Sequence, residues 1–160
     1  MTPDPALDAA IRQARHLLFA FDGTVRQMNA GKSANSTSTT VPHVHDALAA
    51  CRESGRSASV ISANSSADVH AYLDGQDLSA QVTGVVPSIG AAATALNVSP
   101  ADCMLITSSS ADIEAAQAAG TPSIGYAGTP DEAAHMVDIG ATSCIYSMAD
   151  LALTLRARPA

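Results

Sequence analysis

Three short polar clusters follow apolar runs in this chain, and they hold the side chains best able to do chemistry. Asp22 and Thr24 come directly after the run Leu17–Phe21. Ser62 ends a second apolar run, and Thr107–Ser110 follows another. A carboxylate can exchange a proton, while hydroxyls and backbone N–H groups at the start of a helix can bind phosphate or sulfate without a metal. These clusters predict acid–base chemistry or anion binding.

Short apolar runs alternate with stretches of helical periodicity, and these elements must position the polar clusters. The expected strands are Leu17–Phe21, Ala58–Ser62, Gln81–Val86, Cys103–Thr107, Ser123–Tyr126 and Ser143–Tyr146. The expected helices are Pro5–Arg15, a helix between Pro42 and Gly55, one from Asn64 or Ser65 through Leu73, Pro87–Leu96, Ala111–Ala119, Pro130–Ile139 and Met148–Arg156. This alternation predicts an α/β fold, a doubly wound parallel sheet in a single domain spanning residues 1–160.

Ligands of such sheets bind beyond the carboxyl ends of the strands. We therefore expect one crevice to be lined by Asp22, Thr24, Ser62, Asn64, Ser108, Ser109 and Asp112. Structural roles are the alternative: Asp22 in an Asx turn before Gly23, and the serines as caps of the following helices. Both interpretations stay open from the sequence.

Several ordered segments resemble the motifs of the haloacid dehalogenase (HAD) superfamily. Leu17–Val25 is similar to the first motif, in which two aspartates flank one residue before Gly-Thr. Val60–Ser65 resembles the second motif, and Leu105–Gly120 resembles the acidic fourth motif and its helix. The tail Gly125–Leu151 resembles the end of small bacterial HAD hydrolases. The resemblance covers roughly residues 15 to 155 and implies an HAD-like Rossmannoid fold in a bacterial protein.

The same resemblance implies that catalytic groups are missing. Enzymes of this superfamily use the first aspartate as a nucleophile, and Ala20 occupies that position. Asp22 matches the second aspartate, the general acid and base. Val86 stands where a lysine is usual, and no lysine follows Lys32, so the cation is absent unless Lys32 or an arginine reaches in. We expect no aspartyl-phosphate phosphatase activity.

The metal ligands implied by the resemblance are also reduced. Mg²⁺ requires hard oxygen ligands in near-octahedral geometry. Ala20 and Ser108 replace two of the usual carboxylates, which leaves Asp112 and the backbone carbonyl of Asp22. We expect no cofactor and weak or absent Mg²⁺ binding. His43 and His45 do not form a second metal site, because helical residues two apart point in different directions.

Composition excludes several classes of partner. The net charge is -7, and the eight Lys and Arg residues are scattered singly, which disfavours nucleic acid and anionic membrane. Cys51, Cys103 and Cys144 are too widely spaced for a disulfide framework or a zinc site. The polar start Met1–Arg15 does not resemble a signal peptide, and no apolar run reaches the roughly 20 residues of a membrane span. A cytoplasmic protein is expected.

The polar segment Arg26–Pro42 has neither helical nor strand periodicity, and it is expected to be a flexible loop in place of a cap domain. An uncapped crevice would be open to a protein surface or to a small anionic ligand. The sequence thus favours a catalytically impaired HAD-like protein, a pseudophosphatase that acts by binding in a regulatory, scaffolding or assembly role. The alternatives are an enzyme with metal-free acid–base chemistry on a small molecule, and a residual phosphohydrolase.

Overall fold

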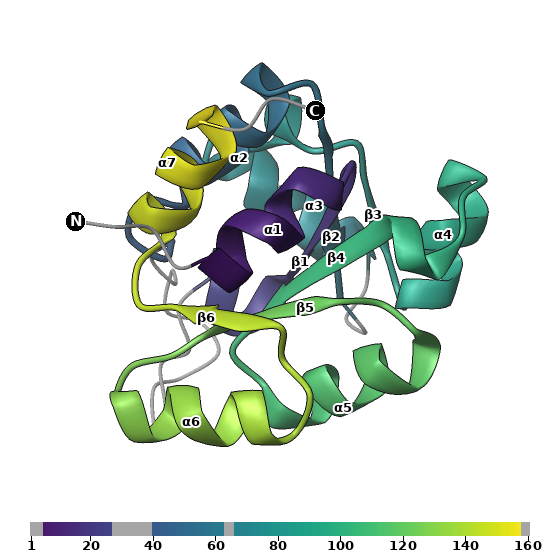
Figure 1. Ribbon diagram of the computed structural model, residues 1–160. Helices are drawn as coiled ribbons and strands as arrows, with labels where there is room; N and C mark the ends of the chain where they lie inside the picture. Colours follow the sequence, from purple (N-terminus) through teal and green to yellow (C-terminus); the bar gives the residue numbers. More distant parts are fainter. Residues whose placement is uncertain (1–4, 27–39, 63–65, 158–160) are drawn as a thin grey trace.

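A parallel sheet organises the computed structural model, which describes residues 5–26, 40–62 and 66–157. Its strands lie in the order β3-β2-β1-β4-β5-β6 (Figure 1). They are β1 (His16–Ala20), β2 (Ser57–Ile61), β3 (Gly84–Val86), β4 (Cys103–Thr107), β5 (Ser123–Tyr126) and β6 (Ser143–Ile145). The chain runs outward from β1 to β3 and then crosses back to β4, on the other side of β1. This reversal puts the ligand-binding switch point of the sheet between β1 and β4.

Helices cover both faces of this sheet, which confirms the predicted doubly wound α/β fold. They are α1 (Pro5–Gln13), α2 (Val44–Glu53), α3 (Ser66–Gly75), α4 (Ile89–Leu96), α5 (Ser110–Ala119), α6 (Pro130–Asp138) and α7 (Met148–Ala157). Successive side chains of a strand point to opposite faces. Phe19 of β1 accordingly packs in one hydrophobic cluster with α2 and α7, while Leu18 packs in another with Ala92 of α4 and Ala116 of α5.

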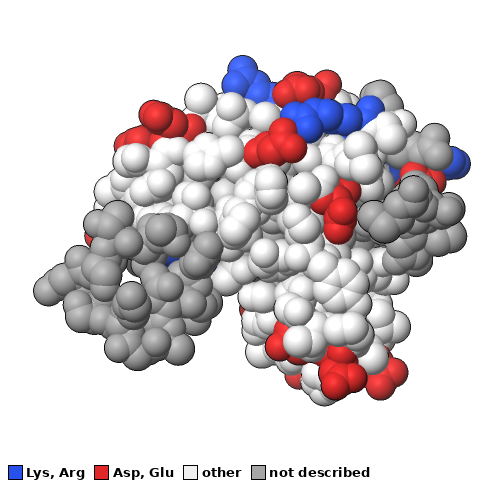
Figure 2. Space-filling view, turned by 90° about the vertical axis from the view of Figure 1, so that its left-hand side faces the viewer, with Lys and Arg blue, Asp and Glu red and all other residues white. Residues whose placement is uncertain are grey.

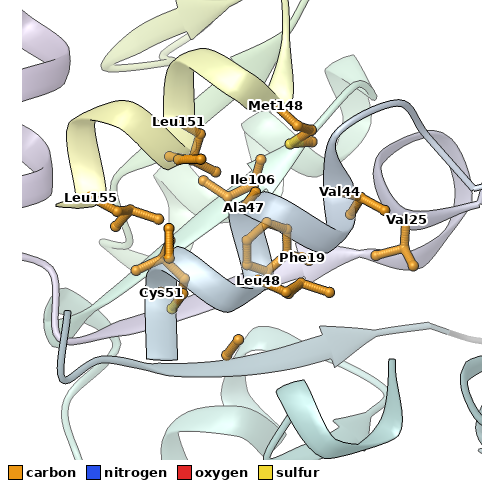
Figure 3. Packing of buried hydrophobic residues seen from close by; sticks show 14 of the residues in the cluster. Phe19, Val25, Val44, Ala47, Leu48, Cys51, Ile106, Met148, Leu151 and Leu155 are labelled. Atoms are coloured by element: carbon orange, nitrogen blue, oxygen red, sulfur yellow. The ribbon is translucent and has the colours of Figure 1, made fainter. Parts of the chain in front are cut away.

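The larger cluster is closed by α2 and α7, which pack against each other over β1 (Figure 3). Leu48 of α2 and Leu151 of α7 are fully buried there. Cys51 also lies in this cluster, and burial raises the pKa of its thiol to about 12. The thiol therefore stays protonated at neutral pH and acts as a small apolar side chain.

One buried arginine ties the first helix to the sheet. Arg56, just before β2, is only 4% exposed. Its Nε donates to the carbonyl oxygen of Ala14 at 2.7 Å, and its Nη2 donates to the carbonyl oxygen of Ile11 at 2.8 Å. Burial lowers the pKa of this guanidinium, but an arginine remains charged at neutral pH. The carboxyl end of α1 is thus held by a cation, which complements the helix dipole.

Most predicted elements lie within two residues of the observed ones, but the strand expected over Gln81–Val86 is wrong in its first half. A 3₁₀ turn occupies Ser79–Gln81, and the strand itself begins only at Gly84. Leu78 is fully buried and anchors that turn, because its carbonyl oxygen accepts the N–H of Gln81 at 2.9 Å. The buried Leu78 thus favours a turn where the weak apolar pattern predicted a strand.

Charged side chains are sparse on the face of the molecule shown in Figure 2, where most of the coloured surface is uncharged. Acidic and basic side chains lie together along its upper edge, whereas its lower part carries acidic ones. Among the ion pairs, Arg156 of α7 contacts Asp46 of α2 at 2.8 Å and Glu53 at 3.3 Å. The hydrogen bond from Arg156 lowers the pKa of Asp46. In the described ranges, no helix is both long and apolar enough to cross a membrane.

Candidate functional site

The carboxyl end of β1 presents a methyl group. Ala20 is the last residue of this strand and is 6% exposed. Its Cα pairs with that of Ile61 in β2, and the preceding Phe19 pairs with Ile106 in β4. The position is therefore flanked by the ends of both neighbouring strands. The side chain at this central position can neither attack phosphorus nor bind a metal.

A tight turn over Phe21–Val25 follows β1 directly. The N–H of Arg26 donates to the carbonyl oxygen of Phe21 at 2.9 Å, which closes a tight turn whose backbone is not helical at Asp22 and Gly23. Gly23 has a φ of 89°, a conformation that a residue without a Cβ adopts at little cost. Thr24 is fully buried, and its hydroxyl donates to the carbonyl oxygen of Ala20. Thr24 thus stabilises the turn from inside.

The side chain of Asp22 is held by an arginine four residues later. Nε of Arg26 donates to Oδ1 of Asp22 at 2.9 Å, and its Nη2 donates to the same oxygen. Both side chains are about one-third exposed, at 33% and 35%. Arg26 thus places a cation beside Asp22, directly after the turn that follows β1. The four-residue spacing between Asp22 and Arg26 is the feature of the sequence that could have indicated this ion pair.

Two aromatic rings complete the surroundings of Arg26. The guanidinium carbon lies 4.6 Å from the ring centre of Phe21 and 5.9 Å from that of Tyr72 in α3. The two rings meet edge to face with centroids 5.3 Å apart. Burial raises the pKa of Tyr72. The sequence reasoning missed Tyr72, because nothing in the spacing of α3 indicates which residue reaches the turn after β1.

At the end of β2, Ser62 is 9% exposed, and its N–H donates to the carbonyl oxygen of Val86 at 3.0 Å. Val86 ends the neighbouring β3, where the resemblance places a lysine. Asn64, predicted to line the same crevice, lies outside the described residues, as does most of the loop expected over Arg26–Pro42. At its two ends this loop forms an antiparallel bridge between Arg26 and Thr40.

The residues after β4 are linked to one another. The hydroxyl of Thr107 donates to Oδ2 of Asp112 at 2.9 Å and accepts the N–H of Ser109 at 3.1 Å. Ser109 is the N-cap of α5, and its Oγ accepts the N–H of Asp112 at 3.4 Å. This is the capping arrangement that the sequence allowed as an alternative. Ser108 is half-buried and has no side-chain hydrogen bond to any described residue.

The comparisons with known proteins bear on the fold. No protein-family model matches the sequence, and no curated protein matches it. Among solved structures, an HAD family hydrolase from Deinococcus radiodurans, with bound phosphate and sodium, is 17% identical with a TM-score of 0.72, over 88% of this chain and 94% of that one. An L-2-haloacid dehalogenase from Xanthobacter autotrophicus, with chloropropionic acid covalently bound, has a TM-score of 0.70 at 11% identity. The match covers 89% of this chain and 98% of that one. The chain has the HAD fold.

A haloacid dehalogenase-like hydrolase from Streptococcus pneumoniae agrees, with a TM-score of 0.70 at 11% identity over 87% of this chain and 97% of that one. The carboxyl ends of β1 and β4 are neighbours in the sheet. The topology thus brings together Ala20, Asp22 and the cluster after β4. At identities this low, the TM-scores establish the architecture alone.

The residues at this edge of the HAD fold are a poor fit for Mg²⁺, which prefers several oxygen ligands, carboxylates among them. Ala20 contributes a methyl group, Ser108 contributes a hydroxyl, and Asp112 is engaged by Thr107. Across the described part of the chain, no three His, Cys, Asp or Glu side chains are grouped so that they could hold a metal. His45 instead contacts the carbonyl oxygen of Gln76 at 2.7 Å.

Proposed function

We propose that this chain is a catalytically impaired HAD-like protein, a pseudophosphatase, that acts by binding in a regulatory, scaffolding or assembly role. The observation that carries this proposal is Ala20 at the end of β1, between the ends of β2 and β4. Phosphoryl transfer through an aspartyl-phosphate needs a nucleophile at the centre of the site. A methyl group there leaves the polar edge formed by the strand ends for binding, and the partner is a protein surface or a small anionic ligand.

The contacts of Asp22 weigh against the alternative of metal-free acid–base chemistry. A general acid or base must reach the proton that it transfers. Oδ1 of Asp22 already accepts two N–H groups from Arg26, and an arginine does not give up its proton in proteins. The ion pair of Asp22 and Arg26 therefore suits a binding surface better than a proton relay.

The purified protein should not hydrolyse phosphate monoesters. Steady-state release of inorganic phosphate from a generic aryl phosphate is expected to stay at the uncatalysed background, because nucleophile, lysine and one metal carboxylate are all missing. Adding Mg²⁺ at millimolar concentration should not change this result, since Asp112 is one carboxylate among neutral groups.

Two outcomes would contradict the proposal. One is turnover clearly above background that disappears in Asp22→Asn. The other is a sub-millimolar Mg²⁺ site in calorimetry that is lost in Asp112→Ala. The matched control is Asp138→Ala, an exposed residue at the carboxyl end of α6, which should leave both measurements unchanged.

A further inference from the structure

The guanidinium of Arg26 is held more firmly than an ordinary surface arginine. One edge is fixed by Oδ1 of Asp22, and one face lies over the ring of Phe21, which is itself 2% exposed. Tyr72 contributes a second ring at 5.9 Å. A cation above an aromatic face is attracted by the ring quadrupole, and the flat guanidinium loses little further freedom when a ligand binds.

The guanidinium of Arg26 has N–H donors that Asp22 does not use. A guanidinium carries five N–H donors in a planar fork, and Asp22 takes one from Nε and one from Nη2. Among the described residues, none accepts a hydrogen bond from Nη1 of Arg26. A third of the side chain is exposed, and the edge formed by Nη1 and Nη2 has the geometry of the bidentate pairing by which arginine recognises carboxylate and phosphate.

The chain offers a direct comparison in its other four-residue pair. Arg12 contacts Asp8 at 3.3 Å on α1, and its side chain is 57% exposed. Among the described residues, no aromatic ring lies near that guanidinium. An exposed ion pair of this kind contributes little to the stability of the fold and holds its side chains only loosely. The two pairs share sequence spacing and differ in how strongly the surroundings hold the cation.

We infer that Arg26 is the oxyanion-binding residue of the crevice, a metal-free cation that recognises a carboxylate or phosphate group, and that Asp22 masks its charge in the free protein. The inference rests on the proposed binding function and names its ligand class. Asp22 supplies a negative charge on the guanidinium edge, so an incoming anion meets a nearly neutral pair and competes with that carboxylate. Removing the charge of Asp22 should then strengthen anion binding, which is the opposite of what a carboxylate acting as a proton donor or metal ligand would show.

The test is titration of inorganic phosphate in metal-free buffer, followed by calorimetry and by the ¹⁵N–¹H signal of the Arg26 side chain. Asp22→Asn should bind phosphate at least fivefold more tightly than the unmodified protein. Arg26→Gln, alone and combined with Asp22→Asn, should bind at least tenfold more weakly than Asp22→Asn. Arg26→Lys should recover only part of the loss, because a lysine keeps the charge without the planar fork.

Asp8→Asn and Arg12→Gln are the matched controls, and neither should change phosphate affinity. Thermal unfolding of each variant identifies any that fail to fold, and Asp22→Ala replaces Asp22→Asn in that case. The inference is overturned if removal of the Asp22 charge weakens or does not change binding, or if phosphate binds equally well without Arg26. Either result leaves the absence of turnover standing, whereas turnover by the unmodified protein would remove the proposed function and not the anion site.

Discussion

Leu151→Ala is expected to lower the free energy of unfolding by about 2–5 kcal/mol, the usual range for a buried leucine that leaves a cavity. Leu151 is fully buried in α7, where this helix packs against α2 over β1 (Figure 3). Truncation removes the apolar contacts of the side chain, and a closely packed core can relax only in part. Urea unfolding monitored by far-ultraviolet circular dichroism measures the loss.

Leu153→Ala is the matched control on the same helix. Leu153 is 71% exposed, so its truncation should change stability by no more than about 0.5 kcal/mol. Equal unfolding midpoints for the two variants would contradict the docking of α7 on α2. Such a result would also mean that these helices do not support β1 and the turn that carries Asp22.

Arg56→Ala should cost about 3 kcal/mol of stability, because it removes two charge-assisted hydrogen bonds and leaves a buried carbonyl group without its partner. The guanidinium is nearly inaccessible to water, and its two bonds hold the carbonyl oxygens of Ala14 and Ile11. Since an arginine stays protonated over the working range, the loss should be the same at pH 6 and pH 8.

Arg52→Ala is the corresponding control for a bond at the surface. Nη1 of Arg52 donates to the carbonyl oxygen of Ala80 at 3.1 Å in an exposed setting, where an interaction contributes little net stability. Its removal should shift the urea midpoint only slightly. A comparable loss in both variants would mean that the Arg56 bonds are not special to the buried site.

The sheet could be predicted because its central strands are short apolar runs buried on both faces. Every residue of β4 is buried, and such strands read as continuous runs bounded by turn residues. The third strand is the exception, since its three residues are only half-buried at an edge and the pattern there is correspondingly weak. The fully buried strands could therefore be predicted from the sequence, and the half-buried edge strand could be predicted only in part.

The site was predictable in its location and less so in its contacts. Strand ends place Asp22, Ser62 and Ser108 at one edge of the sheet, because parallel strands share the direction of their carboxyl ends. The pairing of Arg26 with Asp22 depends on the path of the irregular turn over Phe21–Val25. Its contact with Tyr72 joins residues 46 positions apart, and no local pattern encodes such a distance.

The most direct test of the central claim is hydrolysis of an aryl phosphate by Ala20→Asp in the presence of Mg²⁺. The substitution restores the carboxylate at the end of β1 and nothing else. The account predicts that turnover stays at background, because Val86 and Ser108 still leave the charge of the phosphoryl group without its usual compensation. Circular dichroism and the urea midpoint establish that the variant is folded. Mg²⁺-dependent turnover by the folded variant would contradict the account, since it would show that the rest of the site still supports phosphoryl transfer.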